Sequence, residues 1–206
     1  MQYLSQHRKE CYLYAGIAVA VIVIFIGWYF YQLHYESRAE AMYSSAYSSY
    51  TLTTDVAKEK DTLTKAVDLY KELVEAYPSS RAAGLAYYNL GNLYFSLGDI
   101  DASIEAYTLF LDKSSDKGML TALAYYGLGY CYEAQKDYEQ ALRSFENSES
   151  HSVGKNLKTI NYSNIARIYE KMNNYPKAIE YYKKVIENKV EPFMEGMIKN
   201  KIASLS

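Results

Sequence analysis

Proline, cysteine and histidine are scarce in this sequence. Its 206 residues include three prolines, two cysteines and three histidines. Few prolines leave long helices uninterrupted, because proline inside a helix removes a backbone hydrogen bond. Cys11 and Cys131 lie in segments of different character, so we expect no intramolecular disulfide. His7, His34 and His151 are dispersed along the chain, and we expect no metal site.

An excess of charge of one sign is also lacking. Beyond residue 35 the chain carries 20 Lys and Arg against 23 Asp and Glu, with the signs interspersed. Nucleic-acid binding requires a clustered basic face, so we expect no nucleic-acid partner. No pattern brings a nucleophile, a base and an orienting group together, and Gly127 and Gly129 fall inside an expected helix. The sequence therefore predicts a protein that is not an enzyme and has no cofactor.

One long stretch lacks formal charge altogether. Residues 11–33 are 23 uncharged residues in succession, and as a helix they would span about 35 Å, enough to cross a bilayer. Aromatic residues crowd both ends, with Tyr12 and Tyr14 at one and residues 28–31 at the other. Amphipathic rings settle at the headgroup level of a membrane. We expect a transmembrane helix over residues 11–33.

Two alternatives for this stretch are a buried core helix and a cleaved signal peptide. A domain of this size rarely buries so many uncharged residues in one helix. A signal peptide should end in a small-residue cleavage site, whereas this run ends in Trp-Tyr-Phe-Tyr at residues 28–31. Both alternatives are therefore disfavoured.

The charges that flank the stretch predict its orientation. Arg8 and Lys9 precede it, whereas Arg38 follows it among acidic residues. By the positive-inside rule the tail, residues 1–10, is cytoplasmic. We expect a single-pass protein of the inner (cytoplasmic) membrane, with its C-terminal domain periplasmic or otherwise extracytoplasmic.

The remainder of the chain repeats a short pattern. Tyr-Tyr-x-Leu-Gly at residues 87–91 recurs at residues 125–129, and a degenerate copy occupies residues 162–166. Each copy is followed by a small residue and an aromatic one, at Ser103 and Tyr107, Ala141 and Phe145, and Ala178 and Tyr182. This spacing is the one at which two antiparallel helices pack, with the small residue where their backbones approach.

The recurring pattern resembles the tetratricopeptide-repeat family over residues 43–206. The resemblance implies an all-α solenoid of about four helix-turn-helix repeats, with residues 34–42 as a junction and residues 43–54 as the first helix. A C-terminal capping helix is expected after Pro192, which suits the first position of a helix. Its apolar stripe at helical spacing comprises Phe193, Met194, Met197, Ile198, Ile202 and Leu205.

In this family the first helices of the repeats line a concave face that receives peptides. The family pattern assigns eight residues to such a peptide-binding groove: Tyr88, Asn92, Phe95, Tyr126, Tyr130, Glu133, Arg167 and Lys171. The alternative is that the tyrosines only close gaps between repeats. One subclass captures a C-terminal carboxylate, but Tyr88 stands where its lysine should be. A tyrosine-rich groove instead indicates adaptable recognition of partly apolar segments.

The exit from the uncharged stretch resembles a second, narrower family. Residues 27–32, followed by Ala39, Ala41 and Tyr47, are similar to the ancillary SecYEG translocon subunits. This resemblance implies a chaperone-like adaptor that associates with the translocon or periplasmic chaperones. We therefore expect a membrane-anchored scaffold for protein or peptide partners. The alternative is a structural subunit of an envelope or membrane-associated complex with no peptide-binding role.

Overall fold

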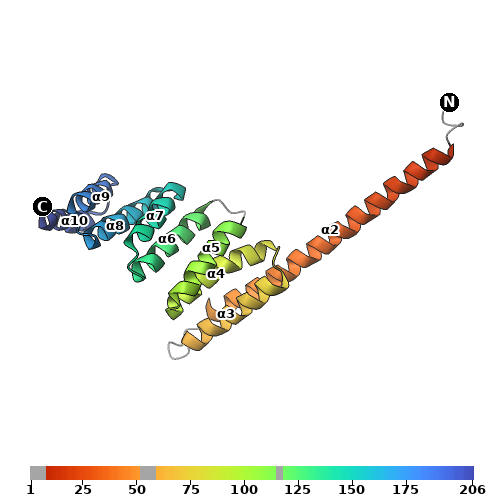
Figure 1. Cartoon of the computed structure of the whole chain (residues 1–206), viewed down its shortest axis with the longest axis horizontal. Coiled ribbons are helices and arrows are strands. Elements are labelled where there is room, and N and C mark those ends of the chain that lie inside the picture. The colour runs from red at the N-terminus through yellow and green to blue at the C-terminus, as the bar shows by residue number, and fades with distance from the viewer. Residues whose placement is uncertain (1–7, 52–58, 115–117) are drawn as a thin grey trace.

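The computed structural model describes residues 8–51, 59–114 and 118–206, which contain nine helices and no strand. The helices are α2 (Arg8–Thr51), α3 (Glu59–Ala76), α4 (Arg81–Leu97), α5 (Ile100–Lys113), α6 (Met119–Ala134), α7 (Tyr138–His151), α8 (Lys155–Lys171), α9 (Tyr175–Glu187) and α10 (Pro192–Leu205). From α3 onward, they stack into an array that leads away from α2 (Figure 1). The predicted all-α class is confirmed.

The first helix, α2, is far longer than the others. Its 44 residues form one uninterrupted helix, about 66 Å long at 1.5 Å per residue. Every residue from Tyr12 to Tyr31 is exposed, and this part projects beyond the stack (Figure 1). Among the described residues, α2 is the one helix long and apolar enough to cross a membrane by length and composition.

The sequence predicts three segments in this region: an anchor (11–33), a junction (34–42) and a first repeat helix (43–54). In the structure a single helix runs through all three segments as far as Thr51. Residues 52–54 lie outside the described residues, as do residues 1–7 of the predicted tail.

The stack begins to contact α2 well before Tyr43. The Ser79 N–H donates to the Tyr35 hydroxyl at 3.3 Å, and the Arg81 N–H donates to Glu36 Oε2 at 3.1 Å. Ala39 is fully buried against the core formed with α3 and α4. The segment expected as a junction therefore packs as part of the first helix pair.

A recurring turn joins the helices of each later pair, with two residues after α4 and three after α6 and α8. Its next-to-last residue has a positive φ, at Gly98 (83°), Lys136 (63°) and Asn173 (58°). Its last residue caps the next helix, because the Asp99, Asp137 and Asn174 side chains accept hydrogen bonds from backbone N–H groups three residues on. These caps satisfy donors that a helix start leaves unpaired, and so they set where α5, α7 and α9 begin.

Glycine on the first helix of a pair lets an aromatic ring of the second approach closely. A Cβ atom added at Gly91 would lie 2.6 Å from Tyr107 Cδ1, and one added at Gly129 would lie 2.5 Å from Phe145 Cε1. Both distances are shorter than a Cβ contact allows. The glycine and the aromatic residue of the repeated pattern are therefore two halves of one contact.

The last helix, α10, caps the stack, but only half of the apolar residues in its predicted stripe pack against the core. Ile198, Ile202 and Leu205 pack on the core that includes Val185 of α9. Phe193, Met194 and Met197 are instead exposed, and Phe193 retains 82% of its surface. The apolar stripe expected from the sequence is thus split between a buried and an exposed side.

Candidate functional site

Five of the eight predicted groove residues line one hollow between α4 and α6. The hollow has a volume of about 380 Å³, and its lining residues are Tyr88, Asn92, Phe95, Tyr107, Leu123, Tyr126, Gly127 and Tyr130. We call it the aromatic hollow. Four tyrosines and a phenylalanine surround it, so its walls are mainly ring surface. Such concave sites with few polar groups are typical of ligand-binding pockets.

Tyr107 reaches the aromatic hollow from α5, on the second helix of its pair. A Cβ atom added at Gly127 would lie 2.4 Å from Tyr107 Cζ, so Gly127 of α6 leaves the space that this ring occupies. The Tyr107 hydroxyl donates to Asn92 Oδ1 at 2.7 Å. Burial raises the pKa of Tyr107 above the usual value for tyrosine, so the phenol stays protonated and keeps this bond.

Tyr126 and Tyr130 form the α6 wall. Their rings meet edge to face with centroids 4.9 Å apart, and their hydroxyls are 3.1 Å apart. The Tyr130 hydroxyl also donates to Asn164 Oδ1 of α8 at 3.1 Å. Burial, followed by the hydrogen bond to Tyr130, raises the pKa of Tyr126 to about 12. Tyr126 is therefore uncharged, and the two hydroxyls of this wall are already engaged with one another.

The other three predicted residues form an ionic cluster beside the hollow. Arg167 Nη1 and Lys171 Nζ of α8 both pair with Glu133 Oε1 of α6, the lysine at 2.7 Å. Arg167 also donates from Nη2 to Asn164 Oδ1 at 3.1 Å and lies over the Tyr130 ring. Glu133 has a side-chain exposure of only 9%, so the cluster holds α6 to α8. Two cations around one carboxylate leave a net charge of +1.

Comparison with known proteins identifies the family. Residues 84–151 and 120–189, together just over half of the chain, match the tetratricopeptide repeat pattern. The chain belongs to the tetratricopeptide repeat (TPR) family. TPR stacks bind other proteins on their extended concave surfaces, and this chain is therefore a scaffold for protein–protein interaction.

Two solved structures align with this chain. The crystal structure of MamA aligns with 66% of this chain and 76% of its own, at 24% identity and a TM-score of 0.53. A thermophilic TPR protein of Thermus thermophilus aligns with 81% of this chain and 98% of its own, at 14% identity and a TM-score of 0.35. No curated protein sequence matches the chain.

Sequence reasoning missed three residues that line the hollow: Tyr107, Leu123 and Gly127. Tyr107 was assigned to packing within its repeat, which is correct but incomplete, because the ring spans from Gly91 of its own TPR to Gly127 of the next. The sequence signal for the contact between Tyr107 and Gly91 was the glycine that ends each Tyr-Tyr-x-Leu-Gly copy, together with the aromatic residue that follows each copy. That signal did not reveal that the Tyr107 ring also faces the concave side.

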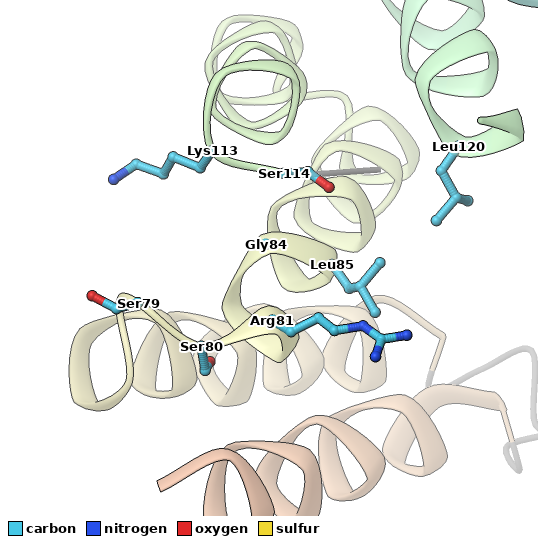
Figure 2. Close-up of a pocket in the computed structure, with 8 residues that line it drawn as sticks. All are labelled: Ser79, Ser80, Arg81, Gly84, Leu85, Lys113, Ser114 and Leu120. Carbon is cyan, nitrogen blue, oxygen red and sulfur yellow. The ribbon is translucent and has the colours of Figure 1, made fainter. Parts of the chain in front are cut away.

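A second hollow of about 730 Å³ lies where α4 begins and α5 ends. It is lined by Ser79, Ser80, Arg81, Gly84, Leu85, Lys113, Ser114 and Leu120. Figure 2 shows the Lys113 and Arg81 side chains directed to opposite sides, so the two cations do not converge on one ligand position. The aromatic hollow is the stronger candidate because its side chains converge.

No metal centre is found in the described part of the chain, and Cys131 is not a reactive thiol. No group of three or more His, Cys, Asp and Glu residues there could hold a metal ion. His34 pairs with Arg38, and His151 lies beside Asn147 and Ser150; His7 lies outside the described residues. Cys131 is buried beside Ser103, and burial raises the pKa of its thiol, so it is held in the unreactive protonated form.

Proposed function

We propose that this protein is a membrane-anchored TPR adaptor whose concave face binds partly apolar segments of other proteins. The observation that carries the proposal is the aromatic hollow between α4 and α6. The hydroxyls of Tyr107, Tyr126 and Tyr130 bond to Asn92, to Asn164 and to one another. A ligand in the hollow therefore meets mainly ring surfaces. Aromatic surface of this kind contributes to binding mainly by burial of an apolar side chain.

The ionic cluster supports a second feature of the ligand. Arg167 and Lys171 remain partly exposed, at 35% and 43% of their side-chain surface, beside a nearly buried Glu133. The exposed charge next to the hollow is therefore positive. A segment with an apolar side chain followed by an acidic one fits this arrangement better than a basic segment.

The exposed part of α2 supports the membrane anchor. Its side chains from Tyr12 to Tyr31 have no partner surface in the stack, and exposed apolar surface on this scale belongs to a membrane or a partner protein. Arg8 and Lys9 favour a cytoplasmic tail and an extracytoplasmic stack. In the inner membrane of a bacterium, this orientation would bring the stack to segments that emerge from the secretion translocon. A chaperone-like adaptor near the translocon, or beside periplasmic chaperones, is our specific hypothesis.

Phe95→Ala tests the role of the hollow with little risk to the fold. Phe95 lines the hollow and is 39% exposed, so its removal should change stability by less than about 0.5 kcal/mol. Tyr175 is a matched control, because it is 42% exposed and lies outside the hollow. In affinity capture from detergent-solubilised membranes, Phe95→Ala should lose partners that Tyr175→Ala retains.

The competing function is a structural subunit that docks through its convex face and uses no groove. In that case Phe95→Ala and Tyr175→Ala would capture the same proteins in the same amounts. If the wild-type chain recovers no translocon, chaperone or envelope-assembly protein, the secretion-side role is wrong.

The orientation has its own test. Protease added to intact spheroplasts should digest residues 43–206 and leave the anchor and tail. Replacement of Arg8 and Lys9 with Glu should weaken this preference, because the orientation depends on positive residues near the membrane ends. A stack that is protected until the membrane is ruptured would reverse the proposed orientation.

A further inference from the structure

The aromatic residues that end the exposed part of α2 continue onto the repeat stack. The ring centroids of Tyr31 and Tyr35 are 6.2 Å apart, and Tyr35 meets Tyr77 edge to face at 5.0 Å. Tyr77 lies in the turn between α3 and α4, at residues 77–80. One line of touching rings therefore leads from the apolar helix to a turn of the TPR stack.

This turn is held at a fixed height along α2. The Ser79 N–H bonds to the Tyr35 hydroxyl and the Arg81 N–H bonds to Glu36. Tyr35 follows Tyr31 by four residues, which is about 6 Å along the helix axis. The headgroup region on each side of a bilayer is itself about 5–8 Å thick. If Tyr31 lies at the membrane interface, the turn lies at the outer limit of the headgroups.

Arg81 lies at the end of this turn, at the same height along α2. It is exposed at the first position of α4. Figure 2 shows its side chain on the side of Leu85, away from Ser79, so its guanidinium reaches the lipid surface only after rotation about its exposed side-chain bonds. Helical Cα–Cβ bonds tilt toward the helix N-terminus. For α4 this is the end that contacts α2 beside Tyr35, which is the end near the membrane.

We propose that the α3–α4 turn is a membrane-surface contact, in which Tyr77 sits among lipid headgroups and the Arg81 guanidinium binds lipid phosphate. The contact rests on the proposed anchor function of α2. Arginine binds phosphate oxygens through two parallel N–H groups, and tyrosine is enriched at membrane interfaces. The first TPR is thereby fixed against the lipid surface, and the later repeats extend away from it.

The test places a fluorophore at either end of α4 in the full chain, reconstituted in vesicles. Ser79→Cys marks the end near α2 and Ser96→Cys marks the far end, about 25 Å along the helix. Both variants carry Cys11→Ser and Cys131→Ala, so that each has one thiol. Lipids with a spin label on the headgroup should quench the fluorophore at residue 79 several-fold more than the one at residue 96. Adding Arg81→Gln should weaken the quenching at residue 79, by up to about fivefold in anionic vesicles.

Trp28 separates failure of this contact from failure of the anchor, because it is the only tryptophan in the chain. Its fluorescence should be quenched by lipids brominated on their acyl chains. If Trp28 is quenched while residues 79 and 96 are quenched equally, the surface contact is wrong and the anchor stands. If Trp28 is not quenched, the anchor itself is wrong. If Arg81→Gln does not reduce the quenching at residue 79, Arg81 takes no part in the contact, and the contact is made by the rest of the turn.

Discussion

At the scale of single residues, Tyr107 shows how one side chain can serve both packing and a surface. Its ring fills the space left by Gly91 in its own helix pair and by Gly127 in the next. Its hydroxyl holds Asn92 at the edge of the aromatic hollow. The same ring therefore sets the distance between neighbouring repeats and the depth of the hollow.

Gly129→Ala should destabilise the fold, although alanine is the better helix former. Helix propensity alone favours alanine by about 1 kcal/mol. The added Cβ would lie 2.5 Å from the buried Phe145 ring, and such overpacking costs about 1–3 kcal/mol. Gly84→Ala is the control, because its Cβ would meet Ser114 at an ordinary 3.8 Å. Chemical denaturation followed by circular dichroism should show Gly84→Ala to be more stable than Gly129→Ala; equal stabilities would contradict the ring contact.

The partly buried Tyr126 predicts a loss of stability at alkaline pH. The pKa of Tyr126 rises from 10.0 to about 12 on folding, mainly through burial. Between these pH values the unfolded chain releases a proton that the folded chain keeps, so the free energy of unfolding falls as pH rises through this window. Below pH 10, Tyr126 is protonated in both states and does not change the free energy of unfolding with pH. Denaturation at several pH values should give a shallower decline for Tyr126→Phe than for the wild type.

At the scale of elements, the turn between α6 and α7 contains a residue in an unfavourable conformation. Lys136 has a φ of 63°, whereas the corresponding positions hold Gly98 and Asn173, which accept this region more easily. Lys136→Gly should therefore stabilise the fold by about 0.5–1 kcal/mol. Gln135→Gly is the control, because Gln135 has a φ of −77° and glycine there should destabilise. Thermal unfolding of both variants tests these two opposite predictions. A loss of stability in Lys136→Gly would contradict the interpretation that Lys136 is in an unfavourable conformation.

Most of the helix pairs could be predicted because their signals are local. The Tyr-Tyr-x-Leu-Gly copies, the turn residues and the aromatic partners recur in register, and each has a fixed role in one pair. The first helix was harder to define, because Ser and Thr are frequent in residues 44–54 and have only modest helix propensity. Its helical state depends on tertiary contacts, notably the burial of Ala39 and Ala46.

The candidate site was predictable only in part for a related reason. The family pattern selected first-helix residues, and five of them line the aromatic hollow. It could not select Tyr107, which enters from a second helix through the space at Gly127. Nor could it show that Glu133 pairs with Arg167 and Lys171, because that contact depends on the registration of α6 against α8.

At the scale of the whole molecule, the absence of any joint in α2 gives the stack a defined azimuth as well as a height. Each residue of an α-helix turns by about 100° and advances by about 1.5 Å. One alanine inserted between Leu33 and His34 would therefore swing the entire stack by about 100° around the helix axis while lifting it by about 1.5 Å. Four alanines would lift it by about 6 Å but leave a net turn of only about 40°.

These two insertions distinguish what the stack faces within the membrane plane. Lipids surround the helix equally in every direction within the membrane plane, so rotation by one inserted alanine should leave the headgroup quenching at residue 79 nearly unchanged. Four inserted alanines should reduce the quenching, because they lift residue 79 away from the headgroups. A neighbouring integral-membrane protein occupies one direction only, and the single alanine should then abolish its cross-linking to the stack. Preserved cross-linking would mean that the partner reaches the TPR repeats from the aqueous side, where helical phase has no bearing on the encounter.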